Sequence, residues 1–304
     1  AMLPRVIFMG SPDFATPTLE ELARSCEVVL VVTQPDRPAG RGRQAQPCAV
    51  KSLADSLSLP TFQPTSLRKL HVVAGLAAYQ PDLIVVAAFG QILPQAVLDI
   101  PAKGCLNVHA SLLPRWRGAA PIQAAILAGD DRTGVTIMQM EAGLDTGPIL
   151  LQREVPLRPG TTASELSQQL AFLGAKALME VLPSYLGGML APMAQNDSHS
   201  TYAPRLNKED GLLDFSEPAQ VLVRKVNAYH PWPGTFFLHN GRKLKVIEAH
   251  VHDTFSSERG ERYVVNGLPA MGTSESLLVL DRVQMEGKKN LPGKDFLRGQ
   301  ADWV

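Results

Sequence analysis

Residues 104–122 read GCLNVHASLLPRWRGAAPI. The first part, 104–110, is short and mostly apolar, which predicts a buried strand. Asn107 and His109 interrupt that run, and because side chains alternate between faces along a strand, both point the same way. We therefore expect a strand that presents an amide and an imidazole on one face and then enters a turn.

Similar apolar runs recur along the first two thirds of the chain. Near-continuous apolar runs are typical of strands covered on both faces, as in a parallel sheet. Helix-length segments separate them, and this alternation predicts a Rossmann-like, doubly wound, mostly parallel α/β domain. The expected strands are 5–10, 27–34, 82–88, 104–110 and 134–140, and the expected helices are 14–25, 47–58, 66–79, 119–128 and 162–187.

The pattern changes after Arg205. Short alternating segments separated by Gly, Asn-Gly and Pro turns follow one helix, 217–228, and predict a small antiparallel barrel or sandwich. We expect a first domain over 2–187, a linker over 188–204 and a second domain over 205–304. The expected strands of this second domain are 235–239, 243–251, 261–266 and 276–284.

The composition is that of an ordinary globular protein. The 304 residues are 45% hydrophobic, and 29 Lys+Arg balance 29 Asp+Glu, so contact with nucleic acid would have to come from local patches. No apolar run is long enough for a bilayer span, and no signal peptide is recognisable. The three cysteines have no metal spacing. We expect a cytoplasmic protein with reduced thiols and no contact with a membrane.

Two common nucleotide-binding devices are missing from the sequence. The first strand leads into MGSPDF, which is not the G-x-G-x-x-G of dinucleotide-binding folds. No G-x-x-x-x-G-K-[ST] occurs either. The predicted topology therefore does not by itself indicate a dehydrogenase or a nucleotide hydrolase.

The polar residues at the predicted sheet edge indicate a different chemistry. Strand 134–140 runs into EAGLDTGPI, and if its carboxyl end lies beside that of 104–110, Asp145 can approach His109. Asn107 can donate to an oxyanion, His109 can move a proton, and Asp145 can orient the ring. Ser111 has no nucleophile-elbow signature, so direct transfer between two bound substrates is favoured. The alternative is that Asn107 and His109 only satisfy backbone groups.

Several segments together resemble one known family. LNVHASLLPRWRGAAPI and GVTIMQMEAGLDTGPIL are similar to the signature of the 10-formyltetrahydrofolate-dependent formyltransferases. GSPDFATPTLEEL, TQPDRPAGRGR, TYAPRLNKEDGLLDF and HPWPGTFF resemble the members that act on initiator methionyl-tRNA. The resemblance covers nearly the whole chain. It implies a Rossmann-like catalytic domain, a C-terminal OB-like β-barrel that binds tRNA, and formyl transfer to the free amine of methionine.

The resemblance also implies roles for individual residues, with no metal. The catalytic trio would be Asn107, His109 and Asp145. The co-substrate 10-formyltetrahydrofolate would be held by Ser111, Leu112, Leu113 and Pro114, and its pterin ring would lie beside Phe89, Gly90, Gln91, Ile92 and Leu144.

The segment 35–43, PDRPAGRGR, is a basic loop that can place guanidinium groups on phosphates. Arg37, Arg41 and Arg43 are its cations, and by the resemblance they would contact the tRNA acceptor arm. The simpler interpretation is a solvated surface loop. Phe14 either lines the pocket for the methionine side chain or packs in the core.

Other functions stay open from the sequence alone. A sugar-nucleotide formyltransferase or a formyltetrahydrofolate hydrolase would carry the same trio, although the basic loop and TYAPRLNKEDG argue against both. A folate- or RNA-binding module without catalysis is the alternative of another class. We expect a monomer from a bacterium or an organelle.

Overall fold

The computed structural model describes residues 2–39, 44–254 and 256–303. The chain divides into two compact units. Unit 1 comprises Ala1–Pro121, Arg132–Val155 and Ser167–Ala203, and unit 2 comprises Ile122–Asp131, Pro156–Leu166 and Pro204–Val304.

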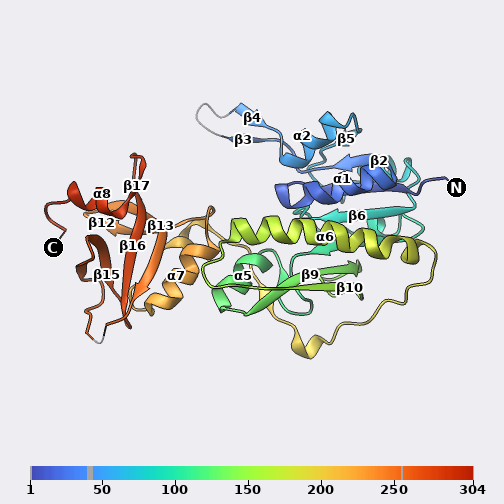
Figure 1. The fold of residues 1–304 in the computed structure, drawn as a ribbon. Helices are drawn as coiled ribbons and strands as arrows, with labels where there is room; N and C mark the ends of the chain where they lie inside the picture. The colour runs from blue at the N-terminus through green and yellow to red at the C-terminus, as the bar shows by residue number, and fades with distance from the viewer. Residues whose placement is uncertain (1, 40–43, 255, 304) are drawn as a thin grey trace. The chain divides into compact units, whose positions relative to one another are not determined.

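A seven-stranded sheet forms the centre of unit 1, in the order β10-β9-β7-β6-β1-β2-β5 (Figure 1). Strands β5, β2, β1, β6 and β7 pair in parallel, which confirms the predicted mostly parallel α/β architecture. Parallel strands buried on both faces explain the near-continuous apolar runs in the sequence. The strands are β1 (Arg5–Gly10), β2 (Glu27–Val32), β5 (Thr61–Phe62), β6 (Leu83–Ala87), β7 (Cys105–His109), β9 (Arg132–Gln139) and β10 (Ile149–Pro156).

Helices cover both faces of this sheet. Those named α3 and α4 share a hydrophobic core with the face that carries Ile84 and Cys105. On the opposite face α6 lies so close that a Cβ at Gly174 would be 2.5 Å from Val108 Cγ1. The helical elements that lie wholly or mostly in unit 1 are η1 (Asp13–Ala15), α1 (Thr16–Ser25), α2 (Ala49–Ser56), α3 (Leu70–Ala77), α4 (Gln95–Leu98), α6 (Ala163–Leu186) and η2 (Asp197–His199). After its first residue, α5 (Pro121–Ala128) belongs to unit 2.

One strand runs against the expected direction. We expected strand 134–140 to lie parallel to 104–110, but β9 pairs with β7 in antiparallel register, with Leu106 opposite Gln139 and His109 opposite Thr136. An apolar run reads the same in both directions, and a strand near the edge of a parallel sheet often runs antiparallel. The carboxyl end of β9 therefore lies at the start of β7, away from His109.

Two short pairings complete unit 1. Antiparallel β3 (Arg37–Ala39) and β4 (Gln44–Gln46) form the base of the basic loop. Parallel β8 (Arg117–Gly118) and β11 (Tyr202–Ala203) join the turn after β7 to the segment that follows α6. That segment, expected as a linker, thus bonds directly to the strand-end turn.

Unit 2 contains an antiparallel sheet in the order β12-β13-β16-β15-β14, with β17 paired to β16. This agrees with the expected antiparallel C-terminal domain. No pairing that closes the sheet into a barrel joins β12 to β14 among the described residues. Its core joins Leu222 of α7 to Leu280 and Trp303. The elements are η3 (Lys208–Gly211), α7 (Ala219–Ala228), β12 (Thr235–His239), β13 (Arg242–His252), β14 (Arg262–Val265), β15 (Leu268–Gly272), β16 (Leu277–Met285), β17 (Asn290–Pro292) and α8 (Gly293–Arg298).

Within the described ranges, the chain has no helix that combines the length and the apolar character needed to cross a bilayer.

Candidate functional site

The carboxyl end of β7 presents Asn107 and His109 on the same face of the sheet, as the alternation of side chains requires. Both residues are buried, with 8% and 6% of their surface exposed. Within the described ranges, no hydrogen bond joins the carboxamide of Asn107 to another residue. A polar group in such a position has donors and an acceptor available for a ligand.

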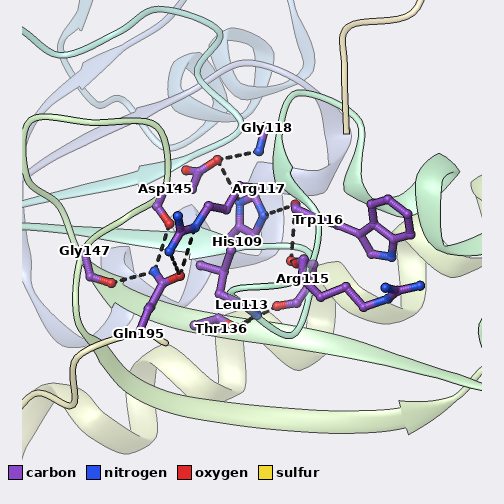
Figure 2. Close-up of polar contacts among 11 residues, drawn as sticks. His109, Leu113, Arg115, Trp116, Arg117, Gly118, Thr136, Asp145, Gly147 and Gln195 are labelled. Carbon is purple, nitrogen blue, oxygen red and sulfur yellow. Dashed lines mark hydrogen bonds and ion pairs between the residues drawn. The ribbon is translucent and has the colours of Figure 1, made fainter. Parts of the chain in front are cut away.

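The ring of His109 lies between a carbonyl and a carboxylate (Figure 2). Its Nε2 is 2.9 Å from Trp116 O, and because a carbonyl only accepts, Nε2 must carry a hydrogen. Its Nδ1 is 3.8 Å from Asp145 Oδ2. That distance is an ion-pair distance and is too long for a hydrogen bond, so Asp145 does not lock the ring.

The turn after β7 places the Trp116 carbonyl at His109. Ser111 Oγ donates to Arg115 O at 2.6 Å, which closes the turn, and the Leu113–Pro114 peptide bond within it is cis. Trp116 has a positive φ of 60° and donates its N–H to Thr201 Oγ1 at 2.9 Å. The sequence that follows the strand is therefore folded so that a backbone acceptor faces the imidazole.

Asp145 reaches the site from the loop between β9 and β10, residues 140–148, here named the Asp145 loop. Since β9 ends beside the start of β7, this loop must return toward the other end of that strand. The backbone N–H of Gly118 donates to Asp145 Oδ2 at 2.8 Å. Asp145 itself has a positive φ of 54°, a conformation that non-glycine residues rarely adopt. The structure thus brings Asn107, His109 and Asp145 together, but by a different path from the one expected.

Three side chains that sequence reasoning did not place in the site support this loop. Gln195 Nε2 donates to Asp145 O at 2.8 Å and to Gly147 O at 2.7 Å. Arg117 holds the other end of the Gln195 amide (Figure 2). Arg117 also forms an ion pair with Asp197 at 2.6 Å. In the sequence, the one sign of this support was an arginine, Arg117, shortly after an apolar strand. Gln195 and Asp197 lie in a segment whose composition is typical of a linker.

In the Ser-Leu-Leu-Pro turn, which was expected to hold folate, Ser111 and Leu113 make contacts within the protein. Ser111 is fully buried, and Leu113 packs in a small core with Met138 and Ile149. The backbone of Leu113 is also engaged, since its N–H donates to Thr136 Oγ1 and its carbonyl accepts from Gln152 Nε2. The side chains in this turn that are partly exposed are Leu112 and Pro114.

The expected pterin-binding residues differ in their environments. Phe89 is in the hydrophobic core and is 2% exposed, so its side chain is a core residue. Gln91 donates to Pro64 O at 3.1 Å. In contrast, Ile92 is 75% exposed and Leu144 is 53% exposed, which is unusual for large apolar side chains. Gly90 is exposed, with a positive φ of 84°.

The remaining predicted residues lie elsewhere in unit 1. Phe14 is partly buried in η1, which follows β1. Arg37 is exposed on β3. Arg41 and Arg43 lie outside the described residues. Across the described ranges, no group of three His, Cys, Asp or Glu side chains is arranged to hold a metal ion.

Both units match known protein families. Residues 4–182 match the family described as "Formyl transferase", and residues 205–301 match "Formyl transferase, C-terminal domain". The chain is 46% identical over 300 residues to a methionyl-tRNA formyltransferase of Geotalea daltonii, with 97% of this chain and 95% of that protein covered. It is 47% identical over 301 residues to a methionyl-tRNA formyltransferase of Thiobacillus denitrificans, with 98% and 97% covered.

Solved structures with low sequence identity share the fold. The N-formyltransferase from Helicobacter canadensis, in complex with folinic acid and dTDP-3-aminofucose, matches with a TM-score of 0.66 and 16% identity, over 93% of this chain and all of that chain. HypX from Aquifex aeolicus, in complex with tetrahydrofolic acid, matches with a TM-score of 0.65 and 16% identity, over 99% of this chain and 47% of that one.

Proposed function

The chain belongs to the formyl transferase family, and we propose that it transfers the formyl group of 10-formyltetrahydrofolate to the free amine of initiator methionyl-tRNA. This proposal rests on the ion-pair contact of His109 with Asp145 at the end of the strand that carries Asn107, whose amide has no hydrogen-bond partner in the described part of the chain. The relatives named as methionyl-tRNA formyltransferases support the choice of acceptor, since they match along 97% or more of this chain.

The reaction needs a proton carrier and a donor for an oxyanion. The amine nitrogen attacks the formyl carbon, a tetrahedral intermediate forms, and the bond from that carbon to N10 of the folate then breaks. The amine loses one proton and N10 gains one, so the protons balance without a metal. His109 is the proton carrier in this proposal, with Asp145 supporting its charged form.

Asn107 supplies the oxyanion donor. An amide N–H aimed at the formyl oxygen binds it more strongly as negative charge develops in the intermediate. Its burial favours this role, because a hydrogen bond to a charged oxygen is stronger where water is excluded. Catalytic hydrogen bonds often shorten when substrates bind, so we expect the 3.8 Å contact between His109 and Asp145 to shorten in the substrate complex.

The folate is proposed to lie across the exposed apolar side chains Ile92 and Leu144 and the partly exposed Leu112 and Pro114. Covering exposed apolar side chains with a ring system removes their apolar surface from water, which favours binding. The side chains of Ser111, Leu113 and Phe89 would then shape this surface from beneath, because they are buried. Gly90 and Gln91 would contribute to folate binding through their backbone and through the conformation of their loop.

The tRNA contacts are proposed for the basic loop and for residues 205–304. Arg37, Arg41 and Arg43 would meet the acceptor arm, and Phe14 would contact the methionine side chain. In this proposal residues 2–187 form the catalytic domain, residues 188–204 connect it, and residues 205–304 form the tRNA-binding domain of a monomer. Three free cysteines, at 26, 48 and 105, fit a location in the reducing cytoplasm.

Acceptor competition tests the proposal directly. The purified protein is incubated with formyl-labelled 10-formyltetrahydrofolate and with initiator methionyl-tRNA, a dTDP-amino sugar, or no acceptor. We expect label on methionyl-tRNA alone. Label on the sugar nucleotide would make the chain a sugar formyltransferase, and formate released without an acceptor would make it a hydrolase. Uncharged tRNA is the control, since it lacks the amine.

A further inference from the structure

Gln195 joins the Asp145 loop to the turn after β7 by hydrogen bonds to both. Its Nε2 donates to two carbonyls of that loop, Asp145 O at 2.8 Å and Gly147 O at 2.7 Å. Its Oε1 accepts from Arg117 Nε at 3.1 Å and from Arg117 Nη2 at 2.9 Å. All the hydrogen-bonding groups of this amide are therefore used, and they connect the turn after β7 with the loop that carries Asp145.

The hydrogen-bonding groups on either side of the Gln195 amide determine which residue type fits at position 195. A guanidinium group only donates, so the atom that faces Arg117 must be an acceptor. Backbone carbonyls only accept, so the atom that faces Asp145 O and Gly147 O must be a donor. A primary amide satisfies both at once. A carboxylate of the same shape keeps the contact with Arg117 but places a negative oxygen against two carbonyls.

Arg117 is held firmly enough to anchor this amide. It is 2% exposed, and its Nη2 contacts Asp197 Oδ1 at 2.6 Å. Burial acts to lower the pKa of Arg117, but hydrogen bonds to Asp197 and Tyr202 outweigh it, so this pKa lies above its ordinary value. The pairing of β8 with β11 also holds the backbone of Arg117 opposite Tyr202.

The Asp145 loop needs such an anchor. Asp145 has a positive φ, which costs on the order of 1–3 kcal/mol for a non-glycine residue and persists only where the surroundings enforce it. Its carboxylate is held by Gly118 N–H, and its backbone carbonyl is held by Gln195. Without the second contact, the hydrogen bond that still holds Asp145 among the described residues is the one from Gly118 N–H to its carboxylate.

We infer that Gln195, held by Arg117, is a positioning residue that fixes Asp145 at His109 for catalysis. The inference rests on the proposed function, because it concerns the same site. Gln195 lies in a segment whose composition suggests only a connection between domains, yet its amide controls the conformation of the residue that supports the imidazole. It does not touch the reacting atoms.

The first test compares an isosteric pair of substitutions. Gln195→Glu keeps the size and the contact with Arg117 but opposes the two carbonyls, and Gln169→Glu makes the same change on an exposed part of α6. We expect Gln195→Glu to lower kcat about 10- to 100-fold, as displacements near 1 Å do, with KM for methionyl-tRNA within about twofold of the wild type. Gln169→Glu should change neither. Gln195→Met, neutral and of similar volume, replaces Gln195→Glu if the latter fails to fold.

The second test asks whether the effect passes through Asp145. In an Asp145→Asn background, Gln195→Glu should lower kcat less than about twofold further, because two residues that act through one contact are not additive. A full loss in both backgrounds would overturn the inference in favour of a general structural defect. An unchanged kcat in Gln195→Glu, or in its Gln195→Met replacement, would also overturn it.

A third measurement separates this inference from the proposed function. Hydrogen exchange at the Gly118 amide reports whether the Asp145 carboxylate stays in place, and it needs no substrate. We expect exchange at least about tenfold faster in Gln195→Glu than in the wild type or Gln169→Glu. Unchanged exchange would contradict the anchor. A wild-type protein that formylates no acceptor would instead contradict the proposed function, and the exchange result would still decide the role of Gln195.

Discussion

Gly118 donates its backbone N–H to the Oδ2 of Asp145 at 2.8 Å, so the turn that follows β7 holds the carboxylate that faces His109. This contact requires an unusual backbone. Gly118 has a φ of 114°, and a Cβ at this position would be 2.5 Å from Ala203 O. Only glycine combines that φ with such a close approach to β11.

Gly118→Ala should therefore disturb the site. The added Cβ must push β11 away or force a change in φ, at a cost of about 1–3 kcal/mol in the free energy of unfolding. We expect kcat to fall by at least about tenfold, since Asp145 loses its fixed donor. Urea unfolding and formyl-transfer kinetics measure the two effects. Gly75→Ala is the control, because no atom lies within 4 Å of its added Cβ, and wild-type behaviour at Gly118→Ala would contradict the account.

Asn107→Ala separates catalysis from stability. The amide of Asn107 makes no hydrogen bond within the described parts of the chain, so its loss should change the free energy of unfolding by less than about 1 kcal/mol. The loss of an oxyanion donor should reduce kcat by about 10²- to 10³-fold. Single-turnover transfer to methionyl-tRNA and urea unfolding of the same preparation test both parts. A strongly destabilised but active variant would show that Asn107 is structural.

Cys105 predicts a pH dependence of stability. Burial, reinforced by the negative charge of Asp99, raises the pKa of the Cys105 thiol from 9.0 to about 12. The folded protein thus holds this proton more tightly than the unfolded chain, so its stabilising contribution is complete below pH 9 and is lost as the pH rises from 9 toward 12.

Urea unfolding near pH 8 and near pH 10 measures this effect. The free energy of unfolding of the wild type should fall more steeply between these values than that of Cys105→Ala, which has no thiol to ionise. The cavity left by the substitution lowers stability at both pH values and so does not alter the comparison. Equal slopes would contradict the assignment.

The basic loop is tested by Arg41→Ala. By the family resemblance, this arginine is the strongest candidate for a contact with the acceptor arm. We therefore expect a severalfold higher KM for methionyl-tRNA, on the order of the loss of one phosphate contact, and an unchanged KM for the folate. Arg24→Ala, which removes an exposed arginine of α1 paired with Glu21, is the control. The defect should shrink as salt rises, and unchanged kinetics on tRNA would remove the loop from the mechanism.

The order of strands and helices along the chain and the break between the two fold types could be predicted, because both depend on local sequence patterns. Continuous apolar runs mark the parallel strands, and the break after Arg205 marks the start of the antiparallel unit. The direction of β9 was predicted wrongly, because an apolar run has no polarity and the choice depends on its neighbour β7. The strand β15 (Leu268–Gly272) was missed, since its Pro and Gly disfavour a strand.

The site was predictable only in part, for a similar reason. Asn107 and His109 follow from the two-residue period of a strand, which a single sequence reveals. The contacts of Gln195 with Asp145 O and Gly147 O link segments about 50 residues apart. Such contacts come from tertiary packing and leave no periodic signal. The burial of Phe89, which the resemblance places beside the pterin ring, also comes from tertiary packing.

The central claim is that His109, supported by Asp145, moves the proton during formyl transfer to methionyl-tRNA. Its most direct test is the single-turnover rate of label transfer from 10-formyltetrahydrofolate to initiator methionyl-tRNA by the wild type and by His109→Ala, both checked for an intact fold. We expect transfer by the wild type and a rate at least about 10²-fold lower for His109→Ala. Equal rates in the two proteins, or a wild type that leaves methionyl-tRNA unlabelled, would contradict it.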